Sequence, residues 1–352
     1  MSRESVSAFA PGRVNLIGEH TDYSQGLALP FAIAEGVTVH AKATGEERIL
    51  ARALDWGEQD EFALTEPAGA MGWHASGRGW RAYMRGVVAE LSRAGHQLVG
   101  AELKIGGNLP QGAGLSSSAA LEVALCLALL GLAGEVEPDR VELARLCSHV
   151  ESEWVGAHTG MLDQLAALYG APGMAMRIDF QTFDVEPVPL RLEDGWRLVT
   201  LDSGERHENA GSAYNERRAE CSEACELLGV DSLRQASWDS LDGLPQRLRE
   251  RARHVLSENM RVTDTIDALR AGDLPAVGRL LNSSHASLRD QYEVSTPAVE
   301  VTVERLLHAG AAGARIVGGG FGGHVLGLLA PSAYAPEGAR EVHADVGAHL
   351  LK

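Results

Sequence analysis

The sequence predicts an α+β protein built from two domains. Its 352 residues are many for a single hydrophobic core and comfortable for two. Strand-like runs occupy the N-terminal part of the chain and return near its C-terminal end, with helical patterns between them. A long, charged helical region follows residue 208, and no internal repeat is visible. We place the division between residues 1–195 and 196–352.

The predicted N-terminal domain begins with strands. Apolar or alternating runs with β-branched residues predict strands at residues 6–10, 14–17, 37–43, 49–54 and 61–64. Helical spacing of apolar residues predicts a helix at 80–93, which ends before Gly95, a residue type that caps helices well. A strand at 98–105 then leads into a glycine-rich loop.

Two helices are expected after this loop. Residues 118–132 are apolar nearly all round, which predicts a buried helix. Residues 138–155 predict a second helix with its proline in the first turn. Strands are then expected at residues 174–179, 183–190 and 197–201. Pro187 and Pro189 place the second of these at the edge of a sheet, because proline cannot donate to a central ladder.

The C-terminal part is helical in pattern from Glu208 to about Leu281, with a loop near residues 241–245. Residues 314–317 and 324–329 read as two strands around a glycine turn. Gly318 to Gly323 contain a formal Gly-x-Gly-x-x-Gly. A dinucleotide site would also need a strand–helix–strand unit, and the following residues resemble a strand, so we do not favour that function.

The charge of the chain argues against several partners. Acidic residues outnumber basic ones by 48 to 31, a net charge of −17, which disfavours nucleic acid and anionic membranes. Phosphate ligands remain possible, because backbone N–H groups and a bound metal can neutralise them. The longest apolar run, 123–133, is too short to cross a bilayer, and no secretory segment opens the chain. We expect a cytoplasmic monomer with reduced thiols at Cys126, Cys147, Cys221 and Cys225.

The most informative stretch is residues 12–23, Gly-Arg-Val-Asn-Leu-Ile-Gly-Glu-His-Thr-Asp-Tyr. It places a guanidinium, two carboxylates and an imidazole next to an apolar run, and buried polar groups need partners. A polyhydroxylated ligand would supply such partners. The alternative is a solvated turn after a strand, which the flanking Gly18 and Gly26 make less attractive because they indicate a tight, shaped loop.

Residues 106–118 form a second candidate site, Gly-Gly-Asn-Leu-Pro-Gln-Gly-Ala-Gly-Leu-Ser-Ser-Ser. Small residues between a strand and a buried helix allow several N–H groups to point at one place, and the helix adds its positive N-terminal end. This pattern indicates a phosphate-binding loop, although no Gly-Lys-Ser/Thr ends it as in a Walker A loop. A serine cap after a flexible loop is the alternative.

Asp163 lies among apolar neighbours in Met-Leu-Asp-Gln. An aspartate in such surroundings either caps a helix, here by accepting from the turn at residues 165–166, or takes part in chemistry. The residues themselves do not decide between these two roles.

Five segments of the chain together resemble the galactokinases of the GHMP small-molecule kinase superfamily. They occur in the order of that family at residues 12–23, 110–121, 151–164, 212–218 and 315–323. The resemblance implies a ribosomal-S5-like N-terminal domain, a ferredoxin-like C-terminal domain and an active site in the cleft between them. It also implies ATP-dependent phosphorylation of the C1 hydroxyl of galactose.

The resemblance assigns roles to particular residues. It implies Asp163 as the catalytic base and Arg13 as the group that stabilises the transferring phosphoryl. It implies a galactose site at Glu19, His20, Asp22, Gly160, Asp163 and Tyr214. It implies ATP binding at Gly112, Ala113, Gly114, Leu115, Ser116, Ser117 and Ser118.

Mg²⁺ is the implied cofactor, with Ser118 and Glu151 as its protein ligands. Ser117 is the alternative to the first, and Glu153 could be confused with the second. Mg²⁺ prefers oxygen ligands and keeps several waters, so one or two protein groups suffice. The glycine stretch 318–323 resembles the third motif of the superfamily, which implies a supporting loop at the cleft.

Two departures from the family pattern concern pocket shape. Thr159 and His324 stand where galactokinases usually carry cysteine. Neither position requires a charge, so the implied chemistry is kept while sugar preference is open. The alternatives are a related sugar-1-kinase acting on N-acetylgalactosamine, arabinose or galacturonate, and a non-catalytic sensor that binds sugar and ATP.

Overall fold

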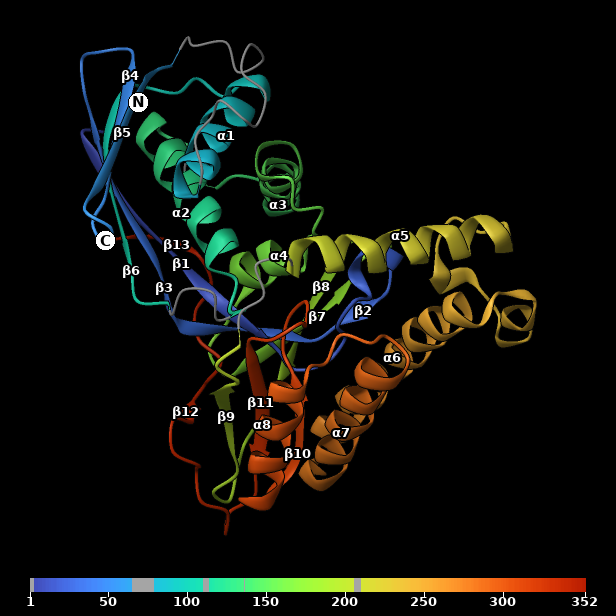
Figure 1. Cartoon of the computed structure of the whole chain (residues 1–352). Coiled ribbons are helices and arrows are strands. Elements are labelled where there is room, and N and C mark those ends of the chain that lie inside the picture. The colour runs from blue at the N-terminus through green and yellow to red at the C-terminus, as the bar shows by residue number, and fades with distance from the viewer. Residues whose placement is uncertain (1–2, 65–78, 110–113, 136, 206–209) are drawn as a thin grey trace.

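The structure is a computed structural model that describes residues 3–64, 79–109, 114–135, 137–205 and 210–352. Figure 1 shows two α+β bodies joined along one side, which confirms the predicted fold class. The three described sheets contain six, four and three strands. All four cysteines are free thiols, as predicted.

The largest sheet forms the N-terminal body. Its order is β13-β1-β3-β6-β4-β5, and only β4 and β6 run parallel. Its strands are β1 (Ser5–Asn15), β3 (Pro30–Ala43), β4 (Arg48–Ala53), β5 (Glu58–Ala63), β6 (Ala101–Gly107) and β13 (His349–Leu351). The prediction of two strands at 6–10 and 14–17 was wrong, because a register shift between Pro11 and Arg13 absorbs Gly12 and keeps β1 continuous.

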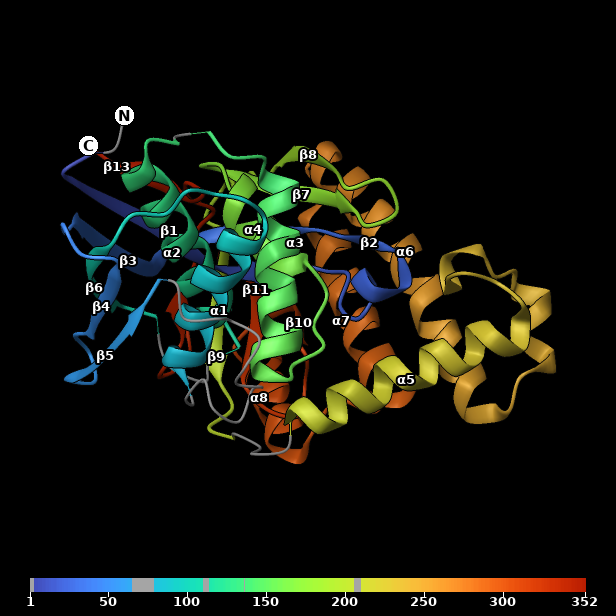
Figure 2. The ribbon, with the colours of Figure 1, turned by 90° about the horizontal axis from the view of Figure 1, so that it is seen from above.

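Helices lie on one face of this sheet, as Figures 1 and 2 show. They are α1 (Trp80–Arg93), α2 (Ser117–Ala133), α3 (Arg140–Val150) and α4 (Leu162–Tyr169). Helices α2 and α4 pack directly on the strands of the sheet, and α1 and α3 pack on those two helices. Helix α2 packs on β1 and β3, and its apolar residues are buried on all sides, as predicted. The predicted helix at 138–155 is α3 followed by a π-helical turn, Glu151–Val155.

A small sheet connects the two bodies. It consists of β2 (Leu27–Ala28), β7 (Met174–Asp179) and β8 (Asp184–Pro189) in the order β2-β7-β8. The two prolines of β8 therefore lie on an edge strand, as predicted.

The second body contains the four-stranded sheet β10-β11-β9-β12. Its strands are β9 (Arg197–Asp202), β10 (Ala311–Ile316), β11 (His324–Leu329) and β12 (Arg340–Glu341). Strands β10 and β11 are antiparallel neighbours, which confirms the predicted pair of strands around a glycine turn. Helices α7 (Leu274–Asp290) and α8 (Pro297–His308) pack against β10.

The predicted helical region is divided into separate helices. Helix α5 (Ala210–Leu228) is followed by two short 3-10 turns, Leu233–Gln235 and Trp238–Gly243, and then by α6 (Gln246–Ala271). Figure 2 shows the far ends of α5 and α6 extending beyond the sheets. Helix α8 had no counterpart in the sequence predictions, although Thr296 caps it at Val299 N and Pro297 occupies its first turn.

The last residues of the chain return to the first sheet, where β13 pairs with β1. The predicted domain boundary between residues 195 and 196 stays a prediction. A single boundary would assign β13 to the C-terminal domain, although this strand pairs with β1 of the first sheet. In the part of the chain that the structure describes, every helix is too short or too polar to cross a membrane.

Candidate active site

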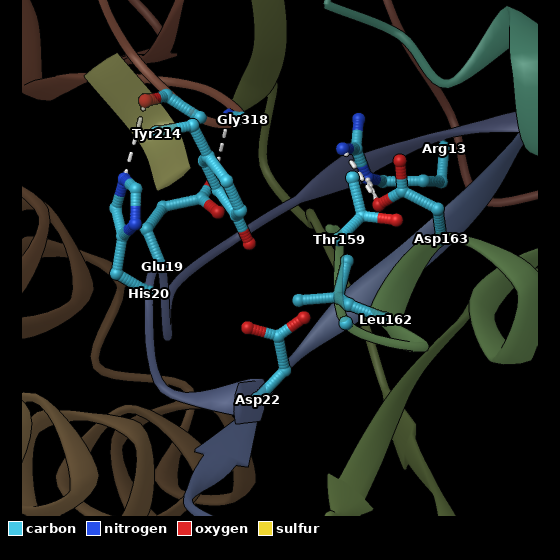
Figure 3. Close-up of a pocket in the computed structure, with 11 residues that line it drawn as sticks. Arg13, Glu19, His20, Asp22, Thr159, Leu162, Asp163, Tyr214 and Gly318 are labelled. Atoms are coloured by element: carbon cyan, nitrogen blue, oxygen red, sulfur yellow. Dashed lines mark hydrogen bonds and ion pairs between the residues drawn. The ribbon is translucent and has the colours of Figure 1, made fainter. Parts of the chain in front are cut away.

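A polar pocket lies where the end of β1, the start of α4 and the glycine turn after β10 meet (Figure 3). Its volume is about 150 Å³. The predicted catalytic pair and all predicted sugar-binding residues line it. The complete lining is Arg13, Glu19, His20, Asp22, Thr159, Gly160, Leu162, Asp163, Tyr214, Gly318 and Gly319.

The loop after β1 turns sharply to present its polar side chains. Gly18 has φ of 99° and His20 has φ of 60°, a left-handed conformation that non-glycine residues rarely adopt. Contacts from α6 hold the loop in this shape. Gly18 N donates to Glu258 Oε1 at 3.0 Å, and the ring of His254 bonds the carbonyl oxygen of Glu19 at 3.1 Å. Asp22 then begins a 3-10 turn, Asp22–Ser24.

Glu19 is buried and paired across the two bodies. Its Oε1 accepts from Gly318 N at 2.8 Å and lies 3.0 Å from Arg315 Nη2. Arg315 is fully buried and also donates from Nη1 to the carbonyl oxygens of Asn15 and Leu16. The carboxylate charge of Glu19 is therefore compensated by a buried guanidinium from β10.

Arg13 and Asp163 lie on the opposite side of the pocket and contact each other (Figure 3). Arg13 Nε donates to Asp163 Oδ1 at 2.9 Å, and Nη2 lies 2.7 Å from the same oxygen. The Ser116 hydroxyl donates to Asp163 Oδ2, and Arg13 Nη1 donates to Gly114 O at 2.6 Å. The carboxylate thus bonds side chains of the site, so the helix-capping alternative for Asp163 was wrong.

Asp22 is the pocket carboxylate whose ionisation is most perturbed. Its pKa is raised to about 6, mainly by burial; a backbone N–H bond at Tyr23 opposes the rise, and the charges of Asp163 and Glu19 contribute to it. A Cβ at Gly160 would lie 1.8 Å from Asp22 Oδ2, so any side chain there would displace the Asp22 carboxylate. Burial also raises the pKa of Tyr214 well above its usual value, so this tyrosine stays a neutral hydroxyl.

The two predicted metal ligands lie together. Burial raises the pKa of Glu151, while hydrogen bonds from Thr159, Ser118 and Gln164 oppose this effect. Thr159 Oγ1 donates to Glu151 Oε2, and Gln164 Nε2 donates to the same oxygen at 3.2 Å. Glu153, by contrast, is exposed. Glu151 is thus a buried carboxylate beside Ser118, and the assignment of these two residues as metal ligands stays a prediction.

The described part of the phosphate loop begins at Gly114. Gly112 and Ala113 lie outside the described residues. Ser116 adopts φ of 61° immediately before α2, so the positive N-terminal end of that helix lies beside Asp163. A Cβ on Gly318 would lie 3.3 Å from Gly114 O and 3.8 Å from Arg13 Nη2. The glycine turn thus lies against the phosphate loop, in agreement with the supporting loop expected at residues 318–323.

The glycine turn is followed by β11, an antiparallel strand, rather than by a helix. This arrangement agrees with the sequence argument against a dinucleotide site.

A second, more apolar pocket adjoins the serine run and was not predicted. Its volume is about 240 Å³. Its lining includes Trp56, Trp80, Tyr83, Ile105, Ser117, Ser118 and Leu121. Its aromatic residues come from the turn between β4 and β5 (Trp56) and from α1 (Trp80 and Tyr83), so no single motif indicates it.

Two further residues of the site also escaped the sequence analysis. Arg315 could have been noticed as a charged residue within the apolar run Ala-Arg-Ile-Val. Gln164 directly follows Asp163, but its contact with Glu151 depends on tertiary packing that no local signal gives.

Matches to family models follow the two bodies. The model described as "GHMP kinases N terminal domain" matches residues 82–171, and "GHMP kinases C terminal" matches residues 265–348. The "Galactokinase galactose-binding signature" matches residues 1–43. The two-body fold, the glycine loop before α2 and the converging polar pocket thus define a GHMP kinase.

Similar proteins identify the family within this class. The galactokinase of Thermotoga petrophila is 40% identical over 326 residues, covering 92% of this chain and 89% of its own length. That of Roseiflexus sp. is 43% identical over 336 residues, covering 91% and 82% respectively. A crystal structure of Lactococcus lactis galactokinase complexed with galactose has a TM-score of 0.89 at 32% identity, over 99% of this chain and 95% of its own. The chain belongs to the galactokinase family.

More distant structures share the fold. A mevalonate kinase aligns over 96% of this chain with a TM-score of 0.68 and 17% identity. Kinases of this superfamily use ATP.

Proposed function

We propose that the protein is a galactokinase that transfers the γ-phosphoryl group of ATP to the C1 hydroxyl of galactose, forming galactose 1-phosphate. One observation carries this proposal. Arg13, Asp163 and Ser116 converge where the polar pocket meets the N-terminal end of α2. A sugar hydroxyl in the pocket would therefore face a phosphate at the helix end.

Asp163 acts as the base for this hydroxyl. Its Oδ1 is occupied by Arg13, and its Oδ2 accepts from Ser116 and keeps a further lone pair for the proton of the C1 hydroxyl. Phosphoryl transfer through a loose transition state requires mainly positioning and charge neutralisation, so a weakly basic carboxylate is sufficient. Arg13 Nη2 adds positive charge beside the equatorial oxygens of the transferring group.

Sugar recognition rests on the opposite wall. The carboxylates of Glu19 and Asp22 accept from vicinal hydroxyls, and the Tyr214 hydroxyl and the Gly160 backbone complete the predicted set, with His20 on the same wall. An epimer that leaves one buried carboxylate oxygen unpaired loses about 1–3 kcal/mol of binding. This is the physical basis for preferring galactose over its C4 epimer.

ATP binding is assigned to Gly112, Ala113, Gly114, Leu115, Ser116, Ser117 and Ser118. The N-terminal end of α2 attracts the phosphates, and the aromatic pocket next to Ser117 and Ser118 suits a flat base.

The residues present also fit Mg²⁺. Ser118 and Glu151 offer neighbouring oxygen donors, and the described residues contain no cluster of three acidic, histidine or cysteine ligands that would indicate another metal. When bound, Mg²⁺ supplies positive charge to the β- and γ-phosphate oxygens. Ser118 and Glu151 would hold it beside the helix end.

The proposal is tested by sugar-dependent release of ADP across a panel of sugars. We expect turnover with galactose and little with glucose. Turnover with only N-acetylgalactosamine, arabinose or galacturonate would identify a related sugar-1-kinase. Binding of sugar and ATP without ADP release would identify a sensor.

Asp163→Asn separates chemistry from binding. The amide cannot take the proton, so we expect turnover to fall by at least about a thousandfold while calorimetric binding of galactose and ATP is kept. Asp267→Asn, which changes an exposed carboxylate on α6, is the matched control. Wild-type turnover in Asp163→Asn would remove this residue from the mechanism.

A further inference from the structure

His20 lines the sugar pocket, yet both of its ring nitrogens contact the protein. Nδ1 lies 2.8 Å from the Tyr23 hydroxyl, and Nε2 lies 3.2 Å from the carbonyl oxygen of Gly319. The residue as a whole is 3% exposed. Each ring nitrogen therefore has a hydrogen-bond partner within the protein.

The hydrogen positions follow from donor and acceptor chemistry. A carbonyl oxygen only accepts, so His20 Nε2 carries the hydrogen that bonds Gly319. Burial, followed by the charge of His254, lowers the pKa of His20 to about 3, so the ring is neutral and has one hydrogen. Nδ1 therefore accepts, and the Tyr23 hydroxyl donates to it.

The same logic orients a longer chain of hydrogen bonds. Because Tyr23 donates to His20, its oxygen accepts from the hydroxyl of Tyr292 at 2.8 Å. The Tyr292 oxygen in turn accepts from the thiol of Cys221 at 3.0 Å. Every donor in this chain has one acceptor, and the direction is set by the carbonyl of Gly319.

Two hydrogen bonds join the loop after β1 to the glycine turn, and the bond between His20 and Gly319 is the second of them. Glu19 accepts from the N–H of Gly318, and His20 donates to the carbonyl of Gly319. Together they hold the glycine turn against the sugar-side loop. On its other side, Gly318 lies against Gly114 and the guanidinium of Arg13. The glycine turn is thus packed between the sugar-binding loop and the residues that face the phosphate.

We propose that His20 is a positioning residue: it uses its Nε2–H to hold the glycine turn beside Arg13 and the phosphate loop, and Tyr23 fixes the ring in the tautomer that does so. This inference rests on the proposed function, because its kinetic readout is sugar phosphorylation. It differs from direct sugar contact in what it predicts. Loss of a sugar contact raises KM, whereas displacement of the glycine turn lowers kcat.

Two substitutions at His20 distinguish the loss of its hydrogen bond to Gly319 from an effect of its left-handed backbone conformation. The amide nitrogen of glutamine reaches the position of Nε2, so His20→Gln keeps a donor for Gly319. Asparagine is too short to reach it, although it tolerates the left-handed conformation of residue 20 better. We expect His20→Asn to lower kcat about tenfold, the loss of one buried hydrogen bond, and His20→Gln to stay within about threefold of wild type.

Two tyrosine substitutions test the direction of the chain. Tyr23→Phe leaves Nδ1 of His20 without a donor, whereas Tyr292→Phe leaves the Tyr23 hydroxyl able to donate. Nitrogen-15 NMR of labelled histidine reports the tautomer directly, with His20 assigned from its missing signal in His20→Gln. We expect the Nε2–H pattern in wild type, a shifted Nδ1 signal in Tyr23→Phe and an unshifted one in Tyr292→Phe.

The outcomes separate the two proposals. An Nδ1–H tautomer in wild type, an asparagine variant more active than the glutamine variant, or a rise in KM alone in His20→Asn would each overturn the positioning role. Absence of sugar-dependent ADP release from wild type would overturn the proposed function instead, and the NMR result would still decide the tautomer.

Discussion

Three carboxylates line one pocket, and two of them are paired with an arginine. Asp163 is paired with Arg13, and Glu19 with Arg315. Among the residues that the structure describes, Asp22 has no such ion pair, and burial is the largest effect on its pKa. A carboxylate in that position is ionised at neutral pH only at some cost, so a ligand that donates hydrogen bonds to it has the most to gain there.

The pH dependence of sugar binding should therefore follow Asp22. Its pKa of about 6 is above the unfolded value of 3.8, so ionising it opposes folding as pH rises through that window. Hydroxyl donors favour the ionised form. We expect galactose affinity, measured by calorimetry from pH 4.5 to 8, to be constant above about pH 7 and to fall tenfold per pH unit well below 6.

The control for this prediction is Asp22→Asn, which should bind galactose weakly with no dependence on pH in this range. A wild-type affinity that stays constant down to pH 4.5 would contradict the assignment.

Thr159 links the sugar pocket to Glu151. It lines the pocket and donates its hydroxyl to Glu151 Oε2. Thr159→Val keeps the shape but leaves a buried carboxylate with one donor fewer, which costs about 1–3 kcal/mol. We expect weaker binding of Mn²⁺, a probe for Mg²⁺, in the presence of a non-hydrolysable ATP analogue, measured by electron paramagnetic resonance. Thr159→Ser keeps the donor and should restore the affinity.

Single residues differed in how well sequence could predict them. Arg13, Glu19, Asp22 and Asp163 could be predicted, because a pattern of polar groups beside apolar ones has few structural explanations and resembles a known family. Arg315 stands out as a charge in an apolar run, but its pairing could not be predicted, because its partner Glu19 is almost three hundred positions away in the chain. The sequence also left the capping role of Asp163 undecided, because its partners Arg13 and Ser116 are distant in the chain.

At the scale of elements, the glycine turn before β11 depends on close backbone approach. Gly320 has φ of 82°, and a Cβ there would lie 2.6 Å from Val294 Cβ and 2.8 Å from its carbonyl oxygen. A valine at this position is both strained and overpacked. The neighbouring Gly318 and Gly319 are hydrogen-bonded to Glu19 and His20. A shift of the turn would therefore displace these two side chains.

Gly320→Val should consequently lose activity beyond its effect on stability. The matched control is Gly229→Val, since Gly229 has φ of 68° and no atom within 4 Å of its Cβ position. We expect both variants to lose about 1–2 kcal/mol from backbone strain, with only Gly320→Val losing most of its turnover. An undiminished kcat in folded Gly320→Val would refute the role of the turn.

The elements themselves were predictable where one physical signal dominated. Helix α2 was predicted from its unbroken apolar composition, and the edge position of β8 from its prolines. The long β3 was predicted only from residue 37, because Pro30 and Gly36 break the alternation of its first half. Tertiary pairing with β1 along both halves overrides that local signal.

At the scale of the whole molecule, the site exists only where the two bodies meet. Strand β1 supplies Arg13 and leads to Glu19, β10 supplies Arg315, and α5 supplies Tyr214. Arg315 is the fully buried charge that crosses this junction, with bonds to the carbonyls of Asn15 and Leu16 as well as to Glu19. Its removal should affect folding and sugar binding together.

Arg315→Met tests this connection. The substitution removes a buried cation and leaves the Glu19 carboxylate without compensation, which costs about 3–5 kcal/mol of unfolding free energy. We expect denaturant unfolding to show that loss, and galactose affinity to fall because Glu19 is no longer held toward the pocket. Arg289→Met is the control, since Arg289 pairs with Asp290 at the surface and its side chain is 46% exposed. Such a pair is worth about 1 kcal/mol or less.

The double variant Glu19→Gln with Arg315→Met distinguishes lost pairing from lost packing. If the cost of Arg315→Met comes from an uncompensated buried carboxylate, neutralising Glu19 should recover much of the stability, so the two changes are far from additive. Galactose binding should stay weak in the double variant, because the pocket has lost a carboxylate acceptor. Additive losses of stability would instead mean that Arg315 acts through its packing and its bonds to β1, with the Glu19 pair contributing little.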